Sequence, residues 1–353
     1  MPATETTARS RPAGAAGGPL LDVRDLHVEF RTRDGVVKAV NGVDYSVDAG
    51  ETLAVLGESG SGKSVTAQAV MGILDMPPGR IPHGEILFHG RDLLRAPGEE
   101  RRKIRGARMA MIFQDALSSL NPVLTVGYQL GEMFEVHHGT SRKEARSKAV
   151  ELMERVRIPA AAKRVHDYPH QFSGGMRQRI MIAMALALEP DLIIADEPTT
   201  ALDVTVQAQV MDLLADLQRE YHMGLVLITH DLGVVADVAD KIAVMYAGRI
   251  VETAPVHELY ERPAHPYTQG LLDSIPRLDR KGKRLHAVKG LPPNLIAIPP
   301  GCEFNPRCPR VQPVCRSDRP PLYGVAEPDG TPLPGRASAC HFWKDELADA
   351  PAP

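Results

Sequence analysis

Hydrophobic and polar positions alternate near the start of the chain and then give way to short, fully apolar runs. Leu26, Val28 and Phe30 are separated by polar residues, and this period of two predicts a half-buried strand. We expect it to pair with residues 39–47 in a small antiparallel sheet. Continuous apolar runs predict buried strands at residues 52–56, 109–113, 192–195 and 225–228.

Helical periodicity dominates the segments between several of these runs. Ser141 and Glu144 have the Ser-x-x-Glu form of a capping box. The apolar stripe of the helix after them consists of Ala145, Ala149, Leu152, Met153 and Val156. A second stripe consists of Val210, Leu213, Leu214, Leu217 and Tyr221. The pattern predicts an α/β fold in which about residues 115–185 form a helical subdomain.

A glycine-rich segment lies between the predicted strand 52–56 and a helix predicted over 64–71. This is the context of a phosphate-binding loop, whose backbone N–H groups converge on phosphates. Lys63 is placed to reach the β- and γ-phosphates, and the Ser64 hydroxyl to ligate Mg²⁺. The alternative is a glycine-rich turn without a ligand. The candidate loop is Gly57, Glu58, Ser59, Gly60, Ser61, Gly62, Lys63 and Ser64.

Acidic and histidine side chains follow two of the apolar strands. Asp196 and Glu197 come directly after residues 192–195, and His230 comes shortly after residues 225–228. Ligands of open α/β sheets gather at the carboxyl ends of the strands. Asp196 would hold Mg²⁺ through water, and Glu197 would orient or polarise an attacking water. Solvated surface acids and a buried core histidine are the alternative interpretations.

A Ser-Gly-Gly sequence precedes another predicted helix. Residues 172–179 read Phe-Ser-Gly-Gly-Met-Arg-Gln-Arg and run into a helix predicted over 180–188. Such a helix start is an anion site, although on its own it is equally typical of an ordinary N-terminal cap.

The order of these motifs resembles that of the ATP-binding cassette (ABC) ATPases over residues from about 20 to 255. The resemblance implies that Gln114 contacts Mg²⁺ and senses a permease, and that His230 contacts the γ-phosphate. It implies that Asp203 communicates across a dimer of two cassettes. It also implies a signature that binds the nucleotide of the opposite subunit, formed by Ser173, Gly174, Gly175 and Met176.

Three positions depart from the usual family pattern. Phe172 and Met176 stand where Leu and Gln are usual, while the Ser-Gly-Gly between them is unchanged. Asp34 falls near the position where members often carry an aromatic residue that stacks on adenine. Phe30, or the aliphatic pair Val36 and Val37, would cover the base instead.

The C-terminal part narrows the resemblance. Residues 262–268 read Arg-Pro-Ala-His-Pro-Tyr-Thr, which is similar to an element of the ATPase subunits of oligopeptide and dipeptide permeases and of their nickel-importing relatives. Eighteen of the 30 prolines lie from Pro255 onward, so we expect an irregular extension over residues 256–353, wrapped on the cassette.

The extension holds all four cysteines of the chain, Cys302, Cys308, Cys315 and Cys340. Four thiolates can bind zinc or a [4Fe–4S] cluster. No pair has the Cys-x₂₋₄-Cys spacing typical of zinc, and the resemblance implies an iron–sulfur cluster in some subfamily members. Unliganded buried cysteines are the third alternative.

Composition limits the remaining possibilities. The chain has 353 residues and a net charge of −3, which gives no general reason to expect nucleic acid as a partner. A basic run from Arg101 to Arg108 is more typical of a solvated helix face than of a nucleic-acid patch, because no aromatics interleave with it. No apolar stretch is long enough to span a membrane. Residues 1–19 lack a signal-peptide pattern and are expected to be a disordered leader, which places the chain in the cytoplasm.

Together, the motifs and the resemblance imply an ATP-hydrolysing subunit of a bacterial peptide importer, at the cytoplasmic face of the membrane. Its expected cofactors are ATP, Mg²⁺ and a [4Fe–4S] cluster. Its expected partners are two integral-membrane permease subunits, a second, related ATPase subunit and an extracytoplasmic substrate-binding protein. A nickel or other small-solute importer is the alternative. A soluble ATPase that acts on DNA or the ribosome, and a nucleotide-binding module without turnover, are less compatible with these motifs.

Overall fold

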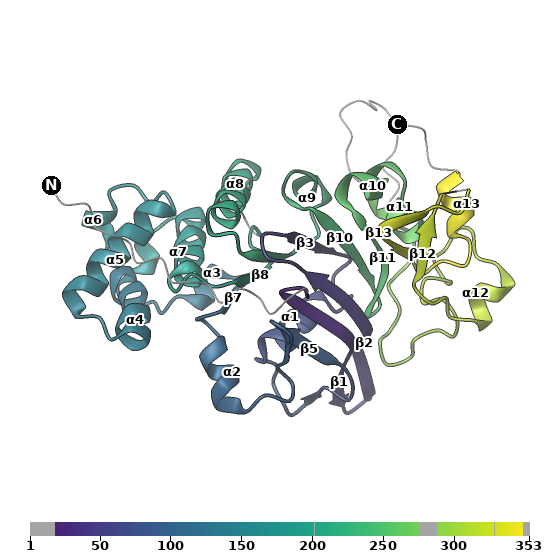
Figure 1. Ribbon diagram of the computed structural model, residues 1–353, viewed down its shortest axis with the longest axis horizontal. Helices are drawn as coiled ribbons and strands as arrows, with labels where there is room; N and C mark the ends of the chain where they lie inside the picture. The colour runs from purple at the N-terminus through teal and green to yellow at the C-terminus, as the bar shows by residue number, and fades with distance from the viewer. Residues whose placement is uncertain (1–17, 201, 275–287, 328, 349–353) are drawn as a thin grey trace.

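Two β-sheets and a group of helices make up the fold (Figure 1). The computed structural model describes residues 18–200, 202–274, 288–327 and 329–348. The larger sheet has eight strands in the order β12-β13-β11-β10-β3-β9-β8-β7. Its strands are β3 (Thr52–Leu56), β7 (Met109–Ile112), β8 (Leu192–Asp196), β9 (Gly224–Ile228), β10 (Lys241–Tyr246), β11 (Arg249–Pro255), β12 (Tyr323–Ala326) and β13 (Pro332–Ser338).

The smaller sheet is antiparallel and is built around β1. Its five strands are β1 (Leu21–Thr32), β2 (Gly35–Val47), β4 (Gly79–Arg80), β5 (Glu85–Phe88) and β6 (Arg91–Asp92). The predicted pairing with residues 39–47 is confirmed. Strand β1 begins at Leu21, before the alternating residues that predicted it. The alternation is interrupted between Val23 and Leu26, where the register shifts and Asp25 adopts a φ of 43°. This bulge keeps the apolar residues on both sides of it buried.

The helices lie on both sides of the larger sheet and in a separate group at the left of Figure 1. That group contains α3 to α7 and corresponds to the predicted helical subdomain. The helices are α1 (Lys63–Met71), α2 (Gly98–Ile104), α3 (Ala116–Ser119), α4 (Val126–His138), α5 (Arg142–Arg155), α6 (Ala161–Arg164), α7 (Gly174–Leu186), α8 (Val204–Tyr221), α9 (Leu232–Val238), α10 (Val256–Glu261), α11 (Pro266–Leu272), α12 (Pro313–Ser317) and α13 (Trp343–Ala348), with a 3₁₀ turn at Pro169–Gln171.

Two helix starts illustrate how local sequence sets these elements. Ser141 caps α5 by accepting a hydrogen bond from the Glu144 N–H at 3.4 Å, as the Ser-x-x-Glu pattern predicts. Helix α7 begins at Gly174, six residues before the predicted start at Ile180. The reason is that Ser173 caps it, accepting from the Met176 N–H at 3.4 Å, so the two glycines form the first turn.

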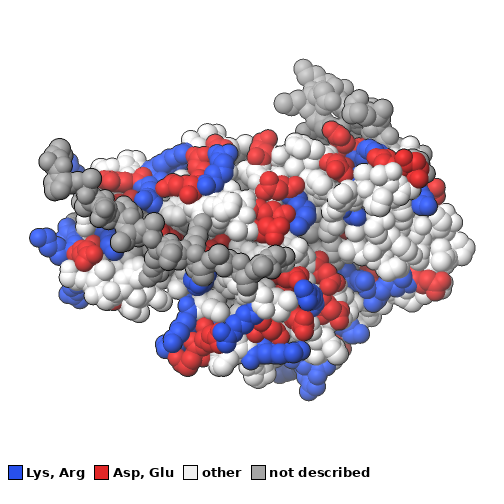
Figure 2. Space-filling model, viewed as in Figure 1, with Lys and Arg blue, Asp and Glu red and all other residues white. Residues whose placement is uncertain are grey.

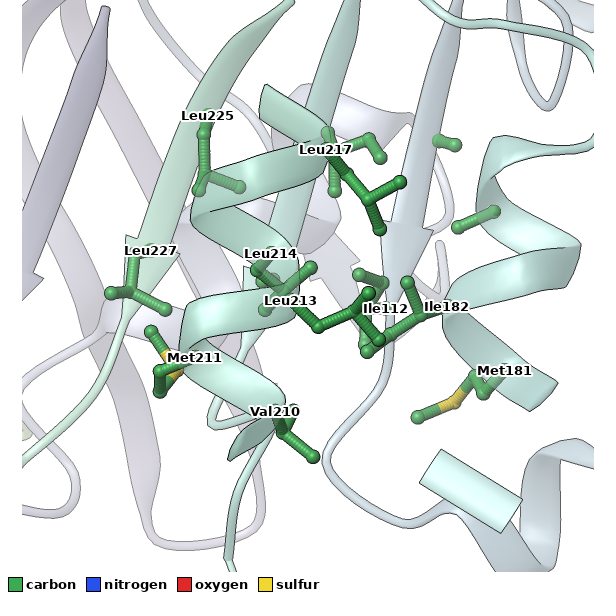
Figure 3. Packing of buried hydrophobic residues seen from close by; sticks show 14 of the residues in the cluster. Ile112, Met181, Ile182, Val210, Met211, Leu213, Leu214, Leu217, Leu225 and Leu227 are labelled. Atoms are coloured by element: carbon green, nitrogen blue, oxygen red, sulfur yellow. The ribbon is translucent and has the colours of Figure 1, made fainter. Parts of the chain in front are cut away.

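The core forms where α8 packs on the parallel strands. Figure 3 shows Leu213 of α8 beside Ile112 of β7, and Met211 of α8 beside Leu227 of β9. Val210, Leu213, Leu214 and Leu217 are no more than 2% exposed, which confirms four positions of the predicted stripe, while the fifth, Tyr221, is half-buried.

The C-terminal extension continues the larger sheet. Strand β13 pairs antiparallel with β11, with Glu252 opposite Ser338 and Thr253 opposite Ala337. Proline-rich composition predicted an irregular segment here and did not predict the β12–β13 pair. Because the sheet runs across residue 255, the proposed boundary between cassette and extension marks a change of sequence type and not a break in the hydrogen-bonded sheet.

Charged side chains of both signs are interspersed on the face shown in Figure 2. In the basic run, Arg102 pairs with Glu99 at 2.9 Å, and Arg108 pairs with Asp191. Arg105 donates to the carbonyl of Gly72 at 2.8 Å. Only the first part of the run lies on α2, where Arg102 and Lys103 are exposed, so the predicted solvated helix face applies there and not to Arg105 and Arg108.

The packing of α8 leads to a first prediction. Leu214 is 0% exposed, so Leu214→Ala should lower the free energy of unfolding by about 3 kcal/mol through lost burial and a residual cavity. Val204 on the same helix is 83% exposed, and Val204→Ala should change the free energy of unfolding by less than about 0.5 kcal/mol. Urea denaturation of both variants measures the difference; equal losses would contradict this description of the core.

Candidate functional site

The phosphate-binding loop connects β3 to α1 and requires glycine at two close approaches. A Cβ atom on Gly57, whose φ is 150°, would lie 2.1 Å from the carbonyl oxygen of Met245. A Cβ on Gly62, whose φ is 106°, would lie 2.3 Å from the carbonyl oxygen of Ala39. Both distances are far below van der Waals contact, so the loop is packed tightly between β10 and β2 in a conformation that favours glycine.

Lys63 is the first residue of α1 and is 5% exposed. Its ammonium donates to the carbonyl oxygens of Gly57 at 2.7 Å and Glu58 at 3.0 Å. Burial lowers the pKa of Lys63, while the nearby carboxylates of Glu197 and Asp196 oppose this shift. The loop therefore surrounds a buried amine close to two acids.

Asp196, at the end of β8, lies beside the start of α1. The Ser64 hydroxyl donates to Asp196 Oδ1 at 3.0 Å. Burial raises the pKa of Asp196, as does Glu197, while the Ser64 hydrogen bond and Lys63 lower it. A hydroxyl and a carboxylate at this distance are the hard oxygen donors that Mg²⁺ prefers, so these residues fit the metal expected with ATP.

Glu197 is the residue around which the remaining polar groups gather. It adopts a φ of 46°, which is uncommon outside glycine, and its N–H donates to the Ile228 carbonyl at 2.8 Å. Its Oε2 accepts from Gln114 Nε2 at 3.0 Å and from Thr200 Oγ1 at 3.0 Å. His230 Nδ1 lies 3.5 Å from Oε1. Two predicted residues, Gln114 and His230, thus meet at the Glu197 carboxylate, and Thr200 is a further partner that the sequence did not indicate.

Lys63, Ser64, Gln114, Glu197 and His230 line a cavity of about 690 Å³, whereas Asp196 and Thr200 are not part of its lining. Its lining residues are Phe30, Val37, Ala39, Ser59, Gly60, Gly62, Lys63, Ser64, Val65, Gln114, Glu197, His230 and Leu295. Of the predicted loop members, Gly57, Glu58 and Ser61 are not among them.

One wall of the cavity comes from the C-terminal extension, which the sequence did not indicate. Leu295 lines the cavity together with Phe30 and Val37. Its carbonyl accepts a hydrogen bond from the Lys38 N–H of β2 at 3.1 Å. Val36, the other predicted cover for a base, is 39% exposed and is not part of the lining.

The predicted signature and Asp203 lie outside this cavity but close to each other. Ser173 and Gly174 are exposed, and a Cβ on Gly175 would lie 2.5 Å from Cγ1 of Val206 in α8. Asp203 caps that helix by accepting from the Val206 N–H at 2.9 Å. Met176 Sδ accepts a contact from Arg164 Nη1 at 3.1 Å. The two helix starts therefore form one packed unit on the surface.

The four cysteines line a second, small cavity within the extension. Cys302, Cys308, Cys315 and Cys340 all contribute to its wall, and none is in a disulfide. Burial raises the pKa of Cys302 to about 11 and that of Cys340 to about 12. Among the residues that the structure describes, no group of three or more His, Cys, Asp or Glu side chains is arranged to hold a metal ion. The structure therefore gathers the predicted ligands without supporting a metal site there.

Comparisons with known proteins agree with this geometry. The ABC transporter family profile matches residues 40–200, and the profile of the oligopeptide/dipeptide transporter C-terminal region matches residues 251–315. The oligopeptide transport ATP-binding protein OppD of Salmonella typhimurium is 50% identical over 93% of this chain and 95% of its own length. This chain belongs to the ABC transporter family. The dipeptide transport ATP-binding protein DppD of Bacillus subtilis is 53% identical over 84% of this ABC protein and 88% of its own length.

A solved structure resembles the cassette part of this ABC protein. The dimeric, post-hydrolysis state of the ATP-binding cassette MJ0796, bound to ADP and Pi, has a TM-score of 0.60 and 26% identity. The match covers 67% of this chain and 98% of that one. The predicted family and the α/β cassette fold are confirmed. In the part of the chain that the structure describes, no helix is long and apolar enough to cross a membrane.

The close approach at Gly57 leads to a second prediction. Gly57→Ala should lower the free energy of unfolding by more than about 2 kcal/mol, because its methyl group would collide with backbone. At Gly60, whose φ is 79°, a Cβ would meet nothing within 4 Å, so Gly60→Ala should cost only the left-handed strain of about 1 kcal/mol. Thermal and urea unfolding of both variants compare the two; a larger loss at Gly60 would contradict the steric explanation.

Proposed function

We propose that this chain is the ATP-hydrolysing subunit of an ABC importer for di- or oligopeptides. The observation that carries the proposal is that Gln114 and His230 contact the Glu197 carboxylate beside a phosphate-binding loop. The chain is also 50% identical to a protein named as an oligopeptide transport ATP-binding protein. The match of residues 251–315 to the oligopeptide/dipeptide transporter C-terminal region supports the peptide class over other solutes.

Within this site, Glu197 would polarise the attacking water, and His230 would contact the γ-phosphate. Glu197 is held by hydrogen bonds from Gln114 and Thr200, which orient its carboxylate. Ser64 and Asp196 would hold Mg²⁺, Ser64 directly and Asp196 through water. The metal supplies charge neutralisation for the phosphates. Lys63 and the loop amides would bind the β- and γ-phosphates.

The base of the nucleotide would lie against Phe30, Val37 and Leu295. These three residues line the same cavity as the phosphate loop, and they present apolar surface without a stacking aromatic at Asp34. The extension would thus contribute to nucleotide binding.

The signature Ser173, Gly174, Gly175 and Met176, with Asp203, would act on the nucleotide of a second cassette. The exposure of Ser173, Gly174 and Asp203, and the position of all five residues outside the cavity of their own chain, support this role. The similar cassette MJ0796 is described as dimeric with ADP and Pi. The second cassette of this importer would be a related chain.

The remaining partners follow from the importer assignment. Its relatives are named as transport ATP-binding proteins, which implies partners in the membrane. We propose two integral-membrane permease subunits, an extracytoplasmic substrate-binding protein and a peripheral position at the cytoplasmic face. The interspersed surface charge gives no support to a nucleic-acid partner (Figure 2).

The four cysteines would hold a [4Fe–4S] cluster. A single zinc ion needs all four sulfur atoms within about 2.3 Å of one point, whereas each thiolate of such a cluster binds a different iron. Four free thiols around one cavity, and the lack of a Cys-x₂₋₄-Cys pair in the sequence, support the cluster over zinc. Its role would be to stabilise a segment that is poor in hydrophobic residues.

The importer proposal is tested by Glu197→Gln. In membranes that hold the chain with its permease partners, this variant should retain ATP binding, while ATP hydrolysis and labelled-dipeptide uptake fall at least about 100-fold, because the base is lost. Glu154→Gln, on an exposed face of α5, is the matched control and should keep both activities. Uptake of a nickel chelate but not of peptides would replace the peptide importer with the alternative, a nickel importer. Unchanged ATP turnover in Glu197→Gln would exclude the role assigned to Glu197.

The cysteine site is tested by metal analysis after anaerobic purification. We expect about four iron and four sulphide per chain, the content of one [4Fe–4S] cluster, and their loss in Cys315→Ser. Ser317→Ala, two residues away, should retain them. Stoichiometric zinc, or no metal at all, would overturn the cluster and leave the ATPase assignment intact.

A further inference from the structure

The C-terminal extension contacts the phosphate-binding loop directly through an ion pair. Arg307 donates from Nη1 to Glu58 Oε2 at 2.6 Å and from Nη2 to Glu58 Oε1 at 2.9 Å. Glu58 is the second residue of the loop. The side chain of Arg307 is 4% exposed, while that of Glu58 is 28% exposed. This two-pronged geometry is the strongest form of an arginine–carboxylate contact.

The guanidinium is held in place from several directions. Nε donates to the Lys289 carbonyl at 3.0 Å, and Nη2 donates to the Val288 carbonyl at 3.3 Å. The group also lies 5.7 Å from the ring centre of Tyr246 and 5.9 Å from that of Phe304. The hydrogen bonds to Glu58 raise the pKa of Arg307. The Arg307 guanidinium is therefore bound on several sides by the C-terminal extension and β10.

A second contact holds the backbone of the same loop residue. The Glu58 N–H donates to the hydroxyl of Tyr267, in α11, at 2.9 Å. Tyr267 is 0% exposed and packs against Tyr246 and Phe304, with ring centres 4.6 and 5.3 Å away. The side chain and the main chain of Glu58 are therefore both bound by residues from beyond β11.

The position of Glu58 matters for the groups that would bind phosphate. Its carbonyl oxygen accepts from Lys63 Nζ at 3.0 Å and from the Ser61 N–H at 3.2 Å. Gly57, directly before it, packs against the Met245 carbonyl, whereas the Cβ position of Gly60, two residues after it, has nothing within 4 Å. Glu58 thus lies between a tightly packed glycine and the open part of the loop, and its side chain and N–H are held by Arg307 and Tyr267.

We propose that Arg307 is a positioning residue for ATP binding, which acts by holding Glu58 and with it the phosphate-binding loop. The inference rests on the proposed nucleotide site. It assigns to the C-terminal extension a share of the affinity for ATP, in addition to any role of its cysteines. If Arg307 only joined the extension to the cassette, its loss would lower stability and leave nucleotide affinity unchanged.

The test measures ATP affinity and turnover separately in the full-length chain. Arg307→Met should raise the Kd of a fluorescent ATP analogue and the KM for ATP about tenfold or more, with kcat within about twofold, because loop order is lost before the chemical step. Arg307→Lys should restore part of the affinity, since an ammonium keeps the charge but not the two-pronged contact. Arg319→Met is the matched control. It removes a different ion pair of the extension, Arg319 with Glu303 at 2.9 Å, and should leave Kd within about twofold.

A double variant separates positioning from general destabilisation. If Arg307 acts through Glu58, Glu58→Gln combined with Arg307→Met should bind ATP no more weakly than Arg307→Met alone. Additive losses, or a lowered Tm with an unchanged Kd, would overturn the proposal. If Arg307→Met does not fold, Glu58→Gln alone disrupts the same ion pair, and its Kd for the ATP analogue tests the proposal. Absence of ATP binding by the unmodified chain would instead exclude the proposed nucleotide site.

Discussion

The parallel pairing of β3, β9 and β8 determines where the polar groups of the site lie. These strands are adjacent, and their carboxyl ends reach the same edge of the sheet. The phosphate loop follows β3, Asp196 and Glu197 stand at the end of β8, and His230 follows β9. All three strands are buried throughout, so a shift of register would place side chains against the wrong neighbours of a close-packed core. The register that packs the core is therefore also the one that brings an ammonium, two carboxylates and an imidazole together.

Three residues at this edge of the sheet adopt conformations or environments that are unfavourable on their own and that the surrounding structure stabilises. Glu197 has a left-handed backbone, Lys63 is a buried amine, and burial raises the pKa of Asp196. Each would relax in an isolated peptide. Here the N–H of Glu197 is fixed on Ile228 and the ammonium on two loop carbonyls, so the charges are ordered before any ligand arrives. Groups that are already oriented need little reorganisation when a triphosphate binds, which is the physical advantage of such a site.

Sequence reasoning succeeded where a local pattern decides the outcome. Fully apolar runs identified β3, β7, β8 and β9, and the Ser141 cap identified the start of α5, because these depend on neighbouring residues. Glu197 and His230 were predicted because each follows such a strand and Gln114 because of the family resemblance, and the structure brings these three side chains together. Sequence reasoning could not find Thr200, Leu295 or Arg307, whose partners are brought close only by the tertiary fold: Arg307 and Glu58 are 249 positions apart. It also missed β12 and β13, because pairing with β11 overrides the weak strand preference of a proline-rich segment.

The strand pair β12–β13 has a consequence for the solubility of this protein. Strand β11 is paired with β10 on one side and with β13 on the other. Were the last part of the chain removed by proteolysis or by a premature stop, β11 would become an edge strand with unpaired N–H and C=O groups next to buried residues such as Ile250 and Ala254. An exposed apolar edge of that kind is a template for intermolecular strand addition. The extension thus protects the cassette from aggregation, and damage confined to the tail would first become visible as insoluble protein.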